Sequence, residues 1–116
     1  MNVEIDIEPL IVGAIMAVAG LLFLAEPFVD PVMLGGRMVP VAALSFVALA
    51  VALDVGAILF YRAGRRSAAL AHGVAGLGWT LLIVGPLLGS VPLWWLGLAV
   101  IIGGAVFLVV EGGRDR

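Results

Sequence analysis

The sequence predicts an all-α integral membrane protein: a four-helix bundle with up-down-up-down topology and both termini in the cytoplasm. Three observations lead to this prediction: an apolar composition, four apolar runs separated by turn residues, and an uneven distribution of arginine. Of the 116 residues, 64% are hydrophobic and 12% are charged, whereas soluble chains are nearer half apolar and a quarter charged. We therefore expect residues 1–116 to form a single transmembrane domain.

Composition also excludes several classes of function. The chain has no cysteine and a single histidine, so disulfides, thiolate metal sites and paired histidine ligands are ruled out within one chain. Its net charge is -2, and it has no basic face that could displace counterions from phosphates, so nucleic acid is not an expected partner. No cofactor motif and no metal-ligand cluster is present in the sequence.

The first apolar run predicts a helix over residues 9–28, long enough for a hydrocarbon core that needs about 20 helical residues. Pro9 suits the first turn, where its missing N–H costs nothing. Glu26 and Asp30 close the run near the headgroups, where we expect them to be solvated; the alternative is that they collect cations at a pore mouth. Only acidic charges precede the run, which is unlike a secretory signal peptide, so we expect it to be retained.

The second run, residues 38–61, contains Asp54. A central Asp costs about 2.5 to 3.5 kcal/mol on insertion, whereas each Leu, Ile, Phe or Val returns about 0.3 to 0.6. Twelve such residues lie in the run, so insertion is favoured. The third and fourth helices are predicted over 67–88 and 92–110, and the tight turn between them makes them antiparallel neighbours.

Arginine sets the predicted orientation. With four spans, the N-terminus, the turn after the second helix and the C-terminus share one side, and cytoplasmic loops carry an excess of basic residues. Five of the six arginines lie on that side, against Arg37 on the other: Arg62, Arg65, Arg66, Arg114 and Arg116. Both termini are therefore predicted to be cytoplasmic, and the chain is predicted to reside in the cell membrane.

Small residues recur at helical spacing and predict close helix packing, because they let backbones approach in lipid. The second run carries the principal stripe, Ala48, Ala52 and Gly56. The other runs carry similar stripes: Gly13 and Ala17 in the first, Ala68, His72 and Gly76 in the third, and Ala99 and Gly103 in the fourth.

Asp54 is the principal candidate for chemistry, because an intramembrane carboxylate is costly unless it is paired, hydrated or protonated. Tyr61 follows seven residues later on the same helix face. A helical hairpin centred on residue 63 would place His72 at the depth of Asp54, and an Asp–His proton relay is one interpretation of this pair. The alternatives are a structural hydrogen bond and a histidine that points toward the cytoplasmic headgroups. Ser45 and Thr80 would also be level, but Ser45 points the opposite way from Asp54, so one interface cannot contain both pairs.

Length and number of spans resemble the small multidrug-resistance exporters, which also use four short helices and a membrane carboxylate. That family carries its essential Glu in the middle of the first helix, whereas residues 13–20 contain no acid here. The four-helix fluoride channels are similar in size, but their Asn and paired-Phe signature is missing from this sequence.

Two functions follow as hypotheses. The first is a non-enzymatic accessory subunit or self-associating helical bundle, with the lipid bilayer and a homo-oligomer or larger membrane complex as its partners. The second is a small proton- or cation-coupled transporter or channel that uses Asp54, with His72, as an intramembrane relay. One deep acid and one histidine are too few convergent groups to propose a reaction, so no enzymatic activity is expected.

Overall fold

Four long helices dominate the computed structural model, which describes residues 6–114. Each helix is long and apolar enough to cross a membrane, which confirms the prediction of an all-α chain with four such helices. Their bounds lie close to those expected from the sequence: α1 Ile7–Ala25, α2 Val41–Arg62, α3 Arg66–Leu87 and α4 Val91–Arg114.

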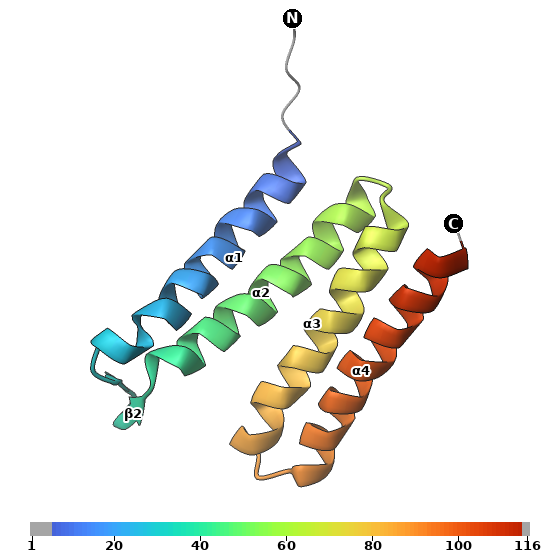
Figure 1. The fold of residues 1–116 in the computed structure, drawn as a ribbon. Helices are drawn as coiled ribbons and strands as arrows, with labels where there is room; N and C mark the ends of the chain where they lie inside the picture. Colours follow the sequence, from blue (N-terminus) through green and yellow to red (C-terminus); the bar gives the residue numbers. More distant parts are fainter. Residues whose placement is uncertain (1–5, 115–116) are drawn as a thin grey trace, which may run out of the picture.

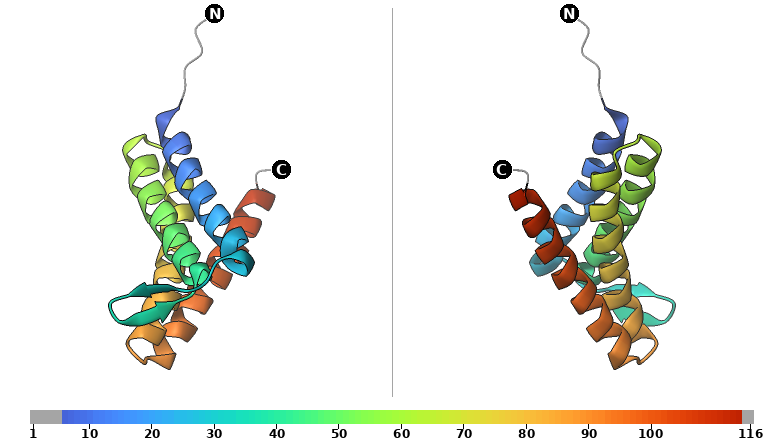
Figure 2. Two further views of the ribbon diagram at one scale, coloured as in Figure 1. Left: turned by 90° about the vertical axis from the view of Figure 1, so that its left-hand side faces the viewer. Right: turned by 90° about the vertical axis from the view of Figure 1, so that its right-hand side faces the viewer.

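The helices pack in chain order, α1 against α2, α2 against α3 and α3 against α4, and no comparable contact joins α1 to α4 in the described part of the chain. Figure 1 shows this row, and Figure 2 shows α4 inclined relative to α2 rather than closing against α1. The arrangement is more open than the predicted bundle. In lipid no hydrophobic force drives helices together, so only faces with close backbone contact need to associate.

Two short turns connect α2 to α3 and α3 to α4. After α2, Gly64 adopts φ 77° and the N–H of Arg65 donates to the carbonyl of Phe60 at 2.9 Å. After α3, Gly89 adopts φ 66° and the N–H of Ser90 donates to the carbonyl of Gly85 at 2.8 Å. Both ends are Schellman-type caps, in which glycine takes the left-handed position without a Cβ penalty.

The connection between α1 and α2 contains a small hairpin that the sequence analysis missed. A 3₁₀ turn, η1 (Glu26–Phe28), follows α1, and strands β1 (Val32–Leu34) and β2 (Arg37–Val39) then pair antiparallel. Gly35 and Gly36 form the turn with φ 57° and 79°, the two positive values that a type I′ hairpin requires. The second helix therefore begins at Val41 instead of residue 38.

Glu26 reaches across this connection to the start of α2. Its Oε2 accepts a hydrogen bond from the backbone N–H of Ala42 at 2.5 Å. The first N–H groups of a helix have no partner within the helix, and Pro40, at the N-cap of α2, makes no side-chain cap. Our expectation that Glu26 is simply solvated was wrong, because it caps a neighbouring helix.

Two groups of side chains join the first three helices. Near the α2–α3 turn, buried Val12, Phe60 and Ala69 form a cluster that joins α1, α2 and α3. Toward the other end, an aromatic series crosses the same helices: Phe23 lies 6.3 Å from Phe46, which stacks on Trp79 at 5.6 Å between ring centroids.

Glycine brings α3 and α4 together. A Cβ at Gly97 would lie 2.7 Å from the carbonyl oxygen of Gly78, and one at Gly85 would lie 2.8 Å from the backbone N of Trp94. The small residues predicted on α4 do not make this contact within the described chain, because Ala99 is exposed and a Cβ at Gly103 would meet nothing within 4 Å. Spacing alone does not say which face of an almost wholly apolar helix meets its neighbour.

Candidate polar site between α2 and α3

Asp54 lies on the side of α2 that meets α3. Its Oδ2 accepts a hydrogen bond from the Thr80 hydroxyl at 3.2 Å. Its side chain also occupies the space above Gly76. A Cβ added to Gly76 would overlap Oδ1 of Asp54 and lie 3.2 Å from the backbone N of Asp54. Gly76 and Thr80 are one turn apart on α3, so glycine gives the carboxylate room and threonine supplies a donor. Asp54 is nevertheless exposed at the surface of the described chain.

His72 has different partners. Its Nδ1 lies 2.8 Å from the carbonyl oxygen of Ala68, one turn earlier in α3. A carbonyl oxygen only accepts, so Nδ1 carries the proton in this contact. The ring packs 4.8 Å from the Phe60 ring, between centroids, and against Gly56, where a Cβ would lie 2.6 Å from its Cδ2. In residues 6–114, no hydrogen bond connects His72 with Asp54.

The difference from the predicted register is about one helical turn. The prediction centred the hairpin on residue 63, which levels Asp54 with His72. In the structure, Asp54 lies opposite Gly76 and Ala57 lies opposite Gly73. A Cβ added at Gly73 would be 3.6 Å from the Cβ of Ala57. The midpoint of both pairs is residue 65, two positions beyond the predicted centre, so each α2 position faces an α3 position four residues later than expected. Ser45 is also separate from Thr80, since its hydroxyl donates to the carbonyl of Ala42 at 2.6 Å.

Close approach of α2 to its neighbours depends on small residues. Ala52 is completely buried, and Gly56 is buried between His72 of α3 and Val12 of α1. Ala48, the third residue of the predicted stripe, is half-buried. A larger side chain at Gly56 would meet both His72 and Val12, so this glycine sets the spacing of three helices.

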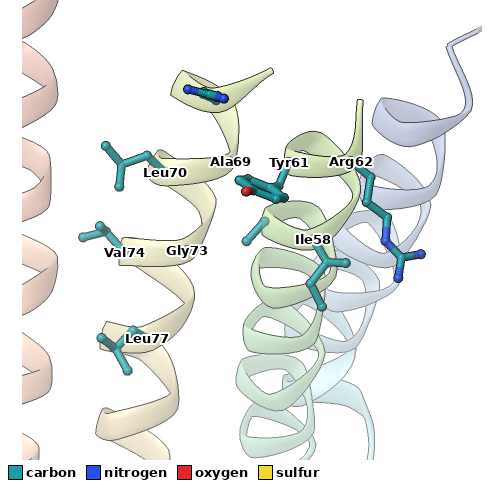
Figure 3. A pocket seen from close by; sticks show the side chains of 10 residues that line it. Ile58, Tyr61, Arg62, Ala69, Leu70, Gly73, Val74 and Leu77 are labelled. Atoms are coloured by element: carbon teal, nitrogen blue, oxygen red, sulfur yellow. The ribbon is translucent and has the colours of Figure 1, made fainter. Parts of the chain in front are cut away.

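Tyr61 lines an open groove between α2 and α3 that has a volume of about 830 Å³ (Figure 3). Figure 3 shows Tyr61 projecting toward α3, with Ile58 and Arg62 beside it on α2. The lining is otherwise apolar, apart from Arg62 and Arg66. Asp54 precedes Ile58 by one helical turn and Tyr61 by two turns. It therefore lies on the same face of α2, farther from the arginine turn.

The arginines predicted to set topology lie together at one end of the helix row. Arg62, Arg65 and Arg66 occupy the α2–α3 turn, and Figure 1 shows that the end of α4, which carries Arg114, lies toward the same end. Arg116 falls outside the described residues. Arg65 lies over the Phe60 ring, 5.1 Å from its centroid, and Arg114 pairs with Glu111 at 3.9 Å.

The polar groups do not converge on one point. No group of three or more His, Asp or Glu side chains within residues 6–114 is placed to hold a metal ion. Comparison with models of known families, with curated protein sequences and with solved structures finds no match to this chain.

Proposed function

We propose that this chain is a non-enzymatic, multi-pass protein of the cell membrane that associates through its open helix faces, either with copies of itself or with a larger membrane complex. The single observation that carries this proposal is the open row of helices, in which the outer members α1 and α4 each pack against only one neighbour in the described chain. In the most apolar stretch of 18 residues, only 11% of the residues are buried for the α1 span and only 6% for α4.

The exposed faces are suited to helix association as well as to lipid. On α1, Gly13, Ala17 and Gly20 are all exposed, and a Cβ at either glycine would meet nothing within 4 Å. On α4, Ala99 and Gly103 are exposed in the same way. Small residues that are unused within the chain allow another helix to approach closely, which is how membrane helices gain dispersion contacts.

In this proposal the helices alternate in direction across the bilayer, and the arginine end faces the cytoplasm. The positive-inside rule supports this orientation. Because the chain has no cysteine of its own, a cysteine introduced by mutation is the only thiol and reports on that position alone. A cysteine at Gly113 should react with an impermeant maleimide only after the cells are permeabilised, and one at exposed Met33 in the hairpin should react in intact cells. The reverse pattern would refute the orientation.

Association is tested by isolation in mild detergent combined with cross-linking in membranes. An Ala17→Cys variant should form cross-links through a bifunctional maleimide, because this position lies on the open face of α1. An Ala50→Cys variant is the matched control, since Ala50 is 6% exposed and packed inside the row. A chain that resists alkaline carbonate extraction but is isolated alone, with no cross-link at Ala17, would contradict the association proposal.

A small proton- or cation-coupled transporter or channel is the second candidate. The specific observation that favours it is the exposed Asp54 carboxylate within an apolar span, hydrogen-bonded to Thr80. A membrane carboxylate of this kind is a default candidate for ion or proton transfer. Thr80 replaces His72 as its partner in this hypothesis, because His72 is held by Ala68 and packed against Phe60.

A further inference from the structure

The groove between α2 and α3 combines an apolar floor with a basic end. Its apolar lining comes from both helices: Ala57 and Ile58 on α2, and Ala69, Leu70, Gly73, Val74 and Leu77 on α3. At the end nearest the α2–α3 turn it is lined by Tyr61, Arg62 and Arg66. From this combination we infer that the groove is a binding site for one anionic phospholipid, with the headgroup at the arginines and an acyl chain along the apolar floor.

Charge supports this occupant. In residues 6–114, neither Arg62 nor Arg66 takes part in an ion pair, and no acidic residue lines the groove. Arg62, Arg66 and Tyr61 therefore line one end of the groove, and neither arginine has an anionic partner in the described chain. Guanidinium donors match phosphate geometry well, and a long arginine side chain can keep its stem on apolar surface while its head reaches the headgroup layer.

The dimensions of the groove agree with one leaflet. From Arg66 to Leu77, α3 advances by about 16 Å at 1.5 Å per residue, and half of a hydrocarbon core of about 30 Å is about 15 Å. A chain anchored at the arginines would thus end near the bilayer midplane. Gly73 and Ala69 lack bulk along this path, so the groove is open where an acyl chain would lie.

The inference rests on the proposed membrane insertion, but not on self-association or on transport. With the arginine end in the cytoplasm, the groove opens to the leaflet that carries anionic lipids, whose surface potential attracts basic residues by about 1 kcal/mol each. Removing both charges should then weaken binding about thirtyfold, because about 1.4 kcal/mol corresponds to a factor of ten.

The test is native mass spectrometry of the delipidated full chain titrated with phosphatidylglycerol and phosphatidylcholine of identical acyl chains. We expect preferential binding of one phosphatidylglycerol, and a loss of about thirtyfold in R62Q/R66Q. The matched control is R114Q, because Arg114 lies at the same end of the row but does not line the groove. Equal binding of the two lipids, or the same loss in R114Q, would overturn the inference.

A second variant separates the groove from simple surface charge. Gly73→Leu should fill the floor, since its Cβ would make only an ordinary 3.6 Å contact with Ala57 and the rest of the side chain would enter the groove. We expect loss of phosphatidylglycerol binding, whereas Gly103→Leu, at an open position on α4, should keep it. Retained binding in Gly73→Leu would refute the groove as the site. Release of the chain by carbonate would instead refute membrane insertion itself.

Discussion

The contact between α3 and α4 gives the most direct quantitative prediction, because it is made by backbone atoms. In Gly97→Ala, the new Cβ would lie 2.7 Å from the Gly78 carbonyl oxygen and 2.9 Å from both the Leu81 Cβ and the Leu82 backbone N. Non-bonded heavy atoms prefer about 3.5–4.0 Å, so the helices must separate by roughly 0.5–1 Å. No flexible side-chain end is available to absorb this displacement.

The magnitude follows from the shared contact. A separation of roughly 0.5–1 Å forfeits a quarter to a half of the dispersion attraction at each affected atom pair. The contacts of Gly78 with Ile101 and of Gly85 with Trp94 depend on the same spacing. Overpacking of this kind costs about 1–3 kcal/mol. We therefore expect Gly97→Ala to lower the free energy of unfolding by that amount.

The assay is reversible unfolding in mixed micelles by increasing fractions of sodium dodecyl sulfate, followed by tryptophan fluorescence. Trp94 and Trp95 lie at the start of α4, with ring centroids 5.0 Å apart, and should report on its separation from α3. Gly103→Ala is the matched control, because it makes the same change on the same helix with nothing within 4 Å. The control should be unchanged or more stable by up to about 1 kcal/mol. Equal stability of the two variants would refute the close glycine contact.

Two further changes test the polar groups. Asp54→Asn should leave assembly intact and abolish any pH-driven flux in reconstituted vesicles if Asp54 relays protons, whereas unchanged flux with weaker assembly would contradict the transport hypothesis. Glu26→Ala should destabilise the chain by about 0.5–2 kcal/mol in the same micelle assay, because the N–H of Ala42 loses its acceptor at the start of α2. The control is Asp30→Ala, at an exposed position of the same connection. Equal loss of stability in the two variants would argue against capping by Glu26.

The number and approximate positions of the helices could be predicted from the sequence because they depend on local properties. An apolar run of about 20 residues satisfies the bilayer wherever the rest of the chain lies. Breaks near Pro31, Gly64 and Gly89 are likewise encoded locally, since these residues favour turns. The hairpin was missed because it is short and continuous with an apolar run, although the Gly35–Gly36 pair that forms its turn was a readable signal.

The partners of the polar residues could not be predicted in the same way. Asp54 and His72 are fixed on their helices by sequence, but their neighbours depend on the register of α2 against α3. In the structure this register is centred on residue 65 rather than 63, a difference of about one helical turn along α3. Thr80 was considered only opposite Ser45, and Gly76 only as part of a packing stripe. In the structure both contact Asp54.

The sequence by itself determined that this chain has four segments apolar and long enough to cross a membrane, and where its charges fall along them. Only the tertiary structure decided which faces meet: Gly97 rather than Gly103 against α3, Thr80 rather than His72 beside Asp54, and an open row with an arginine-ended groove. The physical reason is that nearly every face of these helices is apolar, so hydrophobic periodicity cannot select the contacts. Backbone approach at small residues and the geometry of the turns select them instead.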